Sequence, residues 1–137
     1  MTDRRLVLDA SAVLAWVNAE RGAEPVDRLL PHAVIPAPNL TETLKAARTR
    51  GHALTCDQLR VRIVSMGALI EPFVDDDTVR AAELLLYSAA NPGPSGECLS
   101  LGDAQCIAVA ERLDLPVVGD DRLWSALPLT VKFHSFR

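Results

Sequence analysis

The strongest constraint on the fold is a short apolar run that stops at an acid. Residues 6–8 read Leu-Val-Leu, and Asp9 follows directly. A short run of this kind is typical of a strand buried on both faces, as in a parallel sheet covered by helices. Small and apolar residues then continue over 10–17, which predicts a helix. Asp9 is therefore expected at the carboxyl end of a central strand, where ligands bind in open α/β sheets.

Length and composition favour one folded domain. The chain has 137 residues, close to the commonest domain size, and 49% of them are hydrophobic, which argues against disorder. No stretch approaches the roughly 20 apolar residues that span a bilayer, and the early first strand leaves no room for a signal peptide. Three cysteines without a Cys-x-x-Cys pair argue against a disulfide framework or a zinc ribbon. We therefore expect a single cytoplasmic domain over residues 1–137, with no membrane contact.

The rest of the chain repeats the order of strand and helix. Further strands are predicted at residues 32–35, 68–74, 116–118 and 129–133, and further helices at 25–30, 39–48, 54–66, 75–86 and 100–110. Pro72 places the strand at 68–74 near an edge of the sheet. Asp75, Asp76 and Asp77 are expected to open a helix through its dipole rather than to form a metal cluster. Repeated strand–helix units imply a parallel α/β sheet with right-handed crossovers.

Four acids share one kind of position, just after a strand or in the first turn of a helix: Asp9, Glu42, Asp103, and Asp121 or its neighbour Asp120. All strand carboxyl ends of a parallel sheet point to one edge, so these side chains can meet there. Two carboxylates about 4 Å apart repel by about 4 kcal/mol at an effective dielectric of about 20. A divalent cation would relieve this repulsion. Oxygen ligands without His or Cys favour Mg²⁺ or Mn²⁺, which commonly bind substrate phosphates.

The same acids also have a structural explanation. Asp9 and Asp121 can be helix N-caps, while Asp103 and Glu42 can complete capping boxes. Their partners in those boxes would be Ser100 and Asn39. Taken singly, each acid is better explained as a cap; taken together, their convergence favours a metal site. Ser11, two residues after Asp9, is expected to add a hydroxyl to a bound water or to a carboxylate.

Basic residues gather in one segment of a chain whose net charge is −4. Residues 45–62 contain one acid, Asp57, and five basic residues: Lys45, Arg48, Arg50, Arg60 and Arg62. Two explanations remain open for this segment, a solvated helix surface and a local patch that binds phosphates.

Other phosphate and hydrolase chemistries lack their motifs. The sequence has no P-loop, no Gly-x-Gly-x-x-Gly turn and no Gly-x-Ser-x-Gly elbow. A receiver-like domain with Asp9 as phosphate acceptor is a second hypothesis. Such a domain needs paired acids before its acceptor strand and a Lys at a later strand end. Here Asp3 comes too early, and Lys132 lies inside the predicted last strand.

Four stretches, in this order, resemble the PIN-domain ribonucleases, and specifically the VapC-type toxins of prokaryotic toxin–antitoxin pairs. They begin at residues 6, 39, 99 and 116 and read LVLDASA, NLTE, LSLGDA and PVVGDDRLW. The resemblance implies a three-layer α/β/α fold with a short-stranded parallel central sheet, in one PIN-like domain over residues 1–137. It also implies a metal-dependent endoribonuclease that hydrolyses phosphodiester bonds in RNA with Mg²⁺ or Mn²⁺.

Site residues follow from the matching motifs. By this resemblance the metal-binding and catalytic acids are Asp9, Glu42, Asp103 and Asp121, with Ser11 and Asp120 in support. Asp121 fits better than Asp120, because Arg122 and Trp124 follow it as they do in the family. The chain departs from the family at Gly119, where a Thr or Ser is frequent.

Partners follow from the same resemblance. The family implies an RNA substrate, a homodimer and a small antitoxin that covers the site. The RNA backbone would be held by Lys45, Arg48, Arg50, Arg60 and Arg62. The alternative on the same fold is a non-catalytic module that binds RNA or a partner, and Gly119 is the one residue that supports it.

Overall fold

A computed structural model describes residues 3–137, which form one sheet of five parallel strands. The strands are β1 (Leu6–Leu8), β2 (Ala33–Pro36), β3 (Leu69–Glu71), β4 (Val117–Gly119) and β5 (Phe133–Ser135). Their order is β3-β2-β1-β4-β5, and each neighbouring pair is parallel. β1 is therefore central, as the apolar run predicts, and β3 is an edge strand, as Pro72 predicts.

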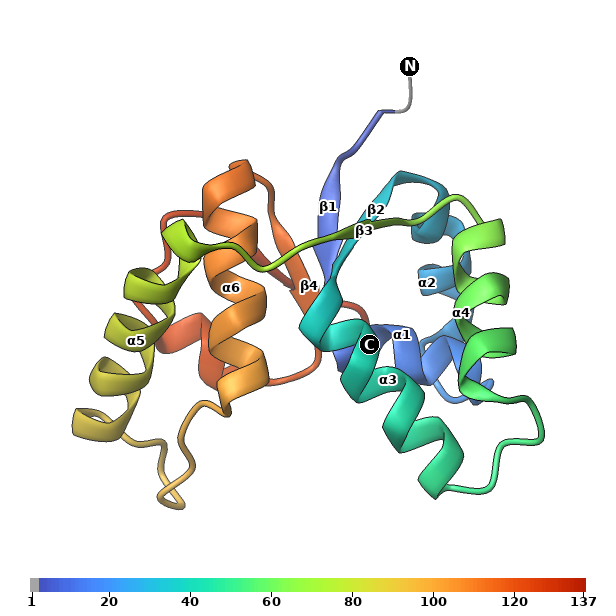
Figure 1. Ribbon diagram of the computed structural model, residues 1–137. Coiled ribbons are helices and arrows are strands. Elements are labelled where there is room, and N and C mark those ends of the chain that lie inside the picture. Colours follow the sequence, from blue (N-terminus) through green and yellow to red (C-terminus); the bar gives the residue numbers. More distant parts are fainter. Residues whose placement is uncertain (1–2) are drawn as a thin grey trace.

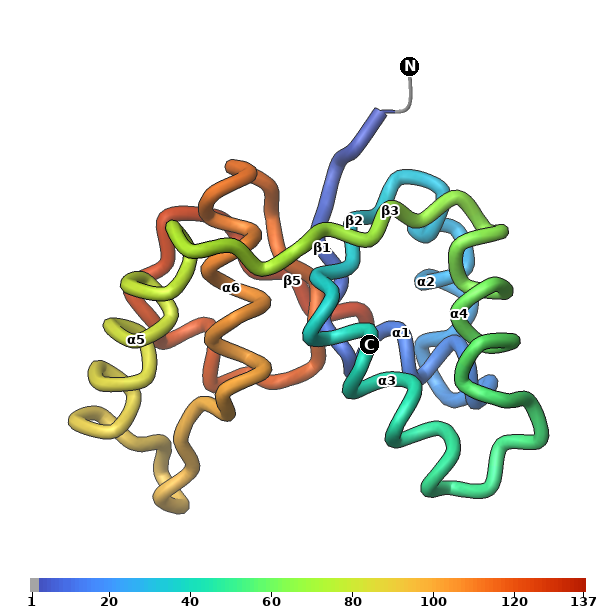
Figure 2. Tube along the Cα trace, in the orientation of Figure 1, coloured from blue at the N-terminus to red at the C-terminus, as the bar shows by residue number. Residues whose placement is uncertain are grey.

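Helices cover both faces of the sheet. Within residues 3–137 they are α1 (Ala10–Val17), α2 (Ala23–Leu29), α3 (Ala37–Thr49), α4 (Cys56–Ser65), α5 (Asp75–Ala90) and α6 (Leu101–Leu113), with short 3₁₀-helices η1 (Leu30–His32) and η2 (Arg122–Ala126). Figure 1 shows α5 and α6 on one side of the strands and α1 to α4 on the other. The chain crosses between these layers through β3, which leads from α4 to α5 (Figure 2). Among these helices none has the length and apolar character that a bilayer span requires.

Strand residues alternate between two hydrophobic clusters, one on each face of the sheet. Leu6 and Leu8 belong to the cluster formed with α1 to α4, whereas Val7 belongs to the cluster formed with α5, α6 and η2. All three side chains are buried. The first strand is thus covered on both faces, and the three-layer α/β/α architecture expected from the sequence is confirmed.

The start of α3 differs from the prediction. The helix begins at Ala37, so Asn39 lies inside its first turn and does not cap it. The predicted capping box between Asn39 and Glu42 is therefore wrong. The reason is local: Pro36 precedes the helix and Pro38 lies in its first turn, where the fixed proline φ is compatible with a helix and no N–H is lost.

Two other boundaries also differ. The last strand is Phe133–Ser135 rather than residues 129–133. Leu129 and Val131 pack against the second hydrophobic cluster from a loop, so their alternation does not reflect a strand. Helix α2 begins at Ala23, two residues before Pro25, which was expected to be its first residue.

Candidate functional site

Asp9 lies at the end of β1 and is the N-cap of α1. Its Oδ1 accepts hydrogen bonds from the Ser11 hydroxyl at 2.6 Å and from the Ala12 N–H at 3.2 Å. Gly119, at the end of the neighbouring strand β4, lies against the same carboxylate, because a methyl group there would come 3.1 Å from Asp9 Cγ. Asp9 is 4% exposed, so this is a buried acid at the centre of the sheet edge.

Asp103 and Asp121 are also helix caps. Asp103 Oδ2 accepts from the N–H of Ser100 at 3.3 Å, and Ser100 Oγ accepts from the N–H of Asp103 at 3.1 Å, which forms the expected capping box of α6. Asp121 caps η2, since its Oδ1 accepts from the N–H of Leu123 at 2.9 Å. The predicted capping roles of Asp103 and Asp121 are thus confirmed, and each uses one carboxylate oxygen.

Glu42 has no capping role. It lies in the second turn of α3, where its Oε1 accepts a hydrogen bond from Asn39 Nδ2 at 3.0 Å. Its carboxylate packs against Gly102 in the first turn of α6. Glu42 therefore reaches from one helical layer to the start of a helix in the other.

The acidic cluster, by which we mean Asp9, Glu42, Asp103 and Asp121, keeps spare oxygens. In residues 3–137 no hydrogen bond reaches the second oxygen of any of them: Asp9 Oδ2, Glu42 Oε2, Asp103 Oδ1 and Asp121 Oδ2. Nor does a Lys, Arg or His in the described chain form an ion pair with the acidic cluster. Each acid therefore combines a local hydrogen bond with an oxygen available to a ligand.

Burial and neighbouring acids raise the pKa of Asp9, Glu42 and Asp103. Burial raises the pKa of Asp9 from 3.8 to about 7, and the charges of Asp103 and Glu42 add to the effect. Burial and then the charge of Asp103 raise the pKa of Glu42, while burial, with a contribution from Asp121, raises that of Asp103. Asp9, Glu42 and Asp103 are thus close enough for their charges to interact, and Asp121 interacts with Asp103. Across the described residues, however, no three acids, histidines or cysteines form a ready-made group of metal ligands.

Two buried side chains lie beside the acidic cluster. Trp124 is fully buried, and its indole N–H lies near Asp103 and lowers the pKa of that acid, although it is outside hydrogen-bond geometry. Cys106 is also fully buried; burial, and then the charges of Asp9 and Asp103, raise the pKa of its thiol well above the usual value. Both are core residues.

Asp120, the alternative to Asp121, has a partner elsewhere. Its carboxylate pairs with Arg137 Nε at 3.0 Å. Arg137 also donates to the backbone carbonyl of Arg21 at 2.7 Å. Asp120 therefore fixes the end of the chain, while Asp121 is the one that contributes to the repulsion at Asp103.

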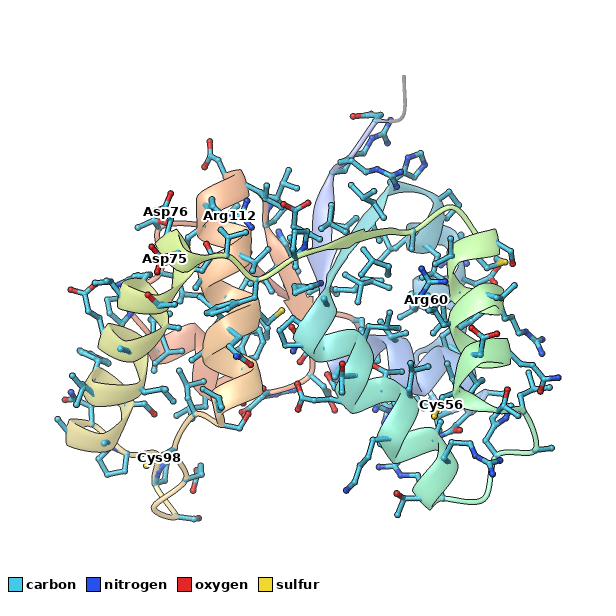
Figure 3. All side chains as sticks on the ribbon, in the orientation of Figure 1. Cys56, Arg60, Asp75, Asp76, Cys98 and Arg112 are labelled. Atoms are coloured by element: carbon cyan, nitrogen blue, oxygen red, sulfur yellow. The ribbon has the colours of Figure 1, made fainter. Side chains whose placement is uncertain are left out.

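The three consecutive aspartates open α5, as predicted, and lie away from the acidic cluster. Asp77 accepts from the N–H of Val74 at 3.0 Å and from Arg112 Nε at 2.7 Å. Figure 3 shows Asp75 and Asp76 beside the end of α6 that carries Arg112. Asp103 lies at the other end of α6, about 13 Å along the helix axis at 1.5 Å per residue.

Most of the predicted basic residues have structural contacts. Arg48 donates to the carbonyls of His52 and Leu54, and Arg50 pairs with Glu20 at 3.2 Å.

Arg62 lies over the Trp16 ring, and Arg60 is exposed on α4 (Figure 3). Lys45 lies one turn from Glu42 on α3, and with Glu42 and Ser11 it lines a surface pocket of about 350 Å³. Lys45 thus shares a pocket with Glu42 of the acidic cluster.

Sequence reasoning missed the parts played by Asn39 and Gly102. Asn39 was interpreted as a cap, and its bond to Glu42 depends on a helix start that the two prolines obscure. Gly102 in the first turn of α6 is a poor helix residue, which is the one local signal that could have drawn attention to it.

Comparisons with known proteins agree with this architecture. The family model for the PIN domain matches residues 6–128. No curated protein sequence matches the chain. Among solved structures, the chain is similar to VapC20 of Mycobacterium tuberculosis, a Sarcin-Ricin loop cleaving toxin, with 21% identity and a TM-score of 0.68 over 88% of this chain and 93% of that one.

Two further structures cover nearly all of both chains. The DNA-bound VapBC of Salmonella typhimurium is 13% identical, with a TM-score of 0.70 over 98% of this chain and 99% of that one. VapBC-5 of Mycobacterium tuberculosis, from the VapBC family of toxin–antitoxin systems, is 22% identical, with a TM-score of 0.56 over 100% and 99%. At these identities the likeness establishes a common fold. Since the family model matches most of the sequence, the chain belongs to the PIN domain family, and its structural neighbours are VapC toxins.

Proposed function

We propose that the chain is a metal-dependent endoribonuclease of the toxin type, which hydrolyses phosphodiester bonds in RNA. One observation carries the proposal. Four acids lie at the sheet edge where α/β folds bind ligands, and in residues 3–137 each keeps one oxygen without a hydrogen bond and has no cationic partner. Membership in the PIN domain family supports it, as does the description of VapC20 as a cleaving toxin.

The acidic cluster fits a divalent cation with oxygen ligands. All its donors are carboxylate oxygens, which Mg²⁺ and Mn²⁺ prefer. Burial, with a smaller contribution from the charges of Asp103 and Glu42, raises the pKa of Asp9 to about 7, and a bound cation would favour its charged form. Asp9, Glu42, Asp103 and Asp121 would hold the ion, which when bound supplies an activated water and stabilises charge on the leaving oxygen.

The chain's own residues have separable parts in this scheme. Ser11 donates a hydrogen bond to Asp9 Oδ1, and Asp9 Oδ2 would then bind the cation. Asp121 is the fourth acid rather than Asp120, because Arg137 already engages Asp120. Lys45, which lines the pocket beside Glu42, would bind a backbone phosphate next to the cleaved bond. The RNA further along would contact Arg48, Arg50, Arg60 and Arg62.

We also propose protein partners for this chain. The neighbouring VapBC structures come from toxin–antitoxin systems, and a small antitoxin and a second copy of the chain are the corresponding partners here. Exposed apolar side chains on α5 support a protein interface, since Val79 and Leu86 are 66% and 72% exposed. Sedimentation of the purified chain is expected to give the mass of a dimer.

A non-catalytic PIN-fold module that binds RNA or a partner is the second candidate. The observation that favours it is that the described residues do not gather three ligands around one point. The receiver-like hypothesis has less support, because Lys132 lines a pocket with Asp114 and Pro116, the residues that precede β4, rather than one at the carboxyl end of the strands.

The test is RNA cleavage by the purified chain in Mg²⁺, in Mn²⁺ and in EDTA. Asp9→Ala and Asp103→Asn are each expected to lower the rate at least about 100-fold, since each removes a metal ligand. Asp121→Asn is expected to lower it more than Asp120→Asn. Asp76→Asn, an exposed acid at the far end of the molecule, is the matched control. Cleavage by Asp9→Ala at the wild-type rate would contradict the proposal, and metal binding without cleavage of any RNA would favour the non-catalytic module.

A further inference from the structure

Asn39 is a buried amide that joins the two helical layers. It is 1% exposed, and its Nδ2 donates to Glu42 Oε1 at 3.0 Å and to the carbonyl oxygen of Gly102 at 3.1 Å. Both partners are acceptors, so the orientation of the amide is fixed with Nδ2 toward them. As a result Asn39 Oδ1 is buried and has no hydrogen-bond partner in the part of the chain that the structure describes.

Stability alone does not explain this arrangement. A buried acceptor without a partner lowers stability, and an apolar side chain of similar size, such as Leu, would avoid the loss. Local features that oppose stability concentrate at functional sites. The other half of the same amide supplies such a function, because it holds Glu42 and connects α3 to the first turn of α6.

Gly102 provides the space that Glu42 occupies. A methyl group built on Gly102 would lie 2.7 Å from Glu42 Oε2 and 2.5 Å from its Cδ, closer than such atoms approach in proteins. Ala would be the better helix residue at this position. The absence of a side chain at residue 102 therefore lets the carboxylate of Glu42 lie next to Asp103, which follows directly in the sequence.

We propose that Asn39 and Gly102 are positioning residues for Glu42: Asn39 fixes the carboxylate by a hydrogen bond, and Gly102 leaves the space for it beside Asp103. The inference rests on the proposed function, because it assigns roles within the same metal site. It predicts that both residues act on metal binding through Glu42 rather than through the stability of the fold.

The test is calorimetric titration of the full chain with Mn²⁺. Asn39→Leu and Gly102→Ala are each expected to weaken Mn²⁺ binding about 10- to 100-fold, the usual effect of losing a group that orients a ligand. In a Glu42→Ala background neither change should weaken Mn²⁺ binding further, because the carboxylate that Asn39 and Gly102 position is gone. Thermal unfolding in EDTA should give Asn39→Leu and Gly102→Ala a Tm at or above that of the wild type.

Thr43→Val is the matched control. Thr43 is buried one turn along α3 and donates to the backbone carbonyl of Asn39 at 2.8 Å, without a hydrogen bond to Glu42. Its loss should leave Mn²⁺ affinity unchanged. The inference would be overturned, and the proposed metal site kept, by either of two results. One is wild-type Mn²⁺ affinity in both Asn39→Leu and Gly102→Ala. The other is that both changes still weaken Mn²⁺ binding as strongly in the Glu42→Ala background. No Mn²⁺ binding by the wild type would overturn the proposed metal site, and this inference with it.

Discussion

Asp9 is a buried carboxyl group whose charge is opposed by its surroundings. Its pKa is about 7 in the folded chain, against an ordinary value of 3.8, mainly because of burial. Between these two pH values the folded chain binds a proton at Asp9 that the unfolded chain has released. The stability that this proton contributes is fully present below pH 3.8 and is lost as the pH rises through about 7.

Asp9→Asn isolates this effect, because it keeps the shape and the cap but removes the charge. In EDTA the variant should gain about 3 kcal/mol of stability over the wild type as the pH rises from about 5 to about 8, because folded Asp9 keeps its proton over about two of those pH units. Thermal denaturation of both proteins at each pH measures the difference. Saturating Mn²⁺ should reduce the gap by stabilising the wild type. A difference in Tm that is the same at both pH values would contradict the assignment.

Residue-level prediction from sequence succeeded where spacing along the chain defines a position. Asp9 follows an apolar run, and Asp103 lies three residues after Ser100, so their places at helix starts could be deduced. Glu42 was placed correctly on α3, but through a cap that does not exist. The bond that holds α3 to α6 joins Asn39 to Gly102, 63 residues away, and no local pattern specifies a contact of that kind.

At the scale of elements, α6 has two ends with different roles. Its first turn carries Asp103 of the acidic cluster, and its last turn carries Arg112. Arg112 donates to Asp77 at 2.7 Å, to Glu71 at 3.1 Å and to the carbonyl of Pro72. One guanidinium thus holds the segment that connects β3 to α5 against α6.

Arg112→Met is expected to destabilise the fold without affecting the proposed metal site. The change leaves Asp77, whose side chain is 1% exposed, without its cation, and should lower the free energy of unfolding by about 2 to 3 kcal/mol. Urea unfolding measures this loss. Arg28→Met, which breaks an exposed pair with Glu24, should change stability little. If Arg112→Met also weakened Mn²⁺ binding more than twofold, the two ends of α6 would not be independent.

Elements were predictable where polar or turn residues flank an apolar segment on both sides. The buried run of α6 and the strands β1, β2 and β4 meet that condition, and each was expected close to its place. The prediction failed at residues 129–133, because Leu129 and Val131 are partly buried by packing against the second cluster without belonging to a strand. Burial in a loop gives the same alternation as a strand, so sequence alone cannot separate the two.

At the scale of the whole molecule, one sheet separates two hydrophobic clusters, and each has its own tryptophan. Trp16 packs against the cluster of α1 to α4, and Trp124 belongs to the cluster of α5, α6 and η2. We propose that residues 1–137 unfold as one unit, because β1 and β4 contribute side chains to both clusters. Fluorescence of Trp16→Phe and of Trp124→Phe should therefore give transitions that coincide with the loss of circular dichroism in each protein. Separate transitions within one variant would indicate two units.

Charge is the other property of the whole molecule that matters for RNA. With a net charge of −4 the chain has little long-range attraction for RNA, so binding should depend on a few local contacts. Lys45→Gln is expected to reduce the salt dependence of RNA binding, measured in EDTA, by about 0.7 in the slope of log K against log salt. Lys132→Gln removes the same charge beside β5 and should leave the slope unchanged. Equal slopes for the wild type and Lys45→Gln would show that Lys45 does not contact an RNA phosphate.

The helix caps have a consequence for how this chain can change over evolutionary time. Asp9, Asp103 and Asp121 each stabilise a helix start through one oxygen, so selection for folding alone favours an acid or a small polar residue at each of these positions. Glu42 caps nothing. If the proposed chemistry were lost, selection for folding would therefore still favour three of the four acids, whereas residue 42 would be free to change. We predict that, among relatives of this chain, the residue at position 42 separates proteins that retain the proposed cleavage from proteins that retain only the fold.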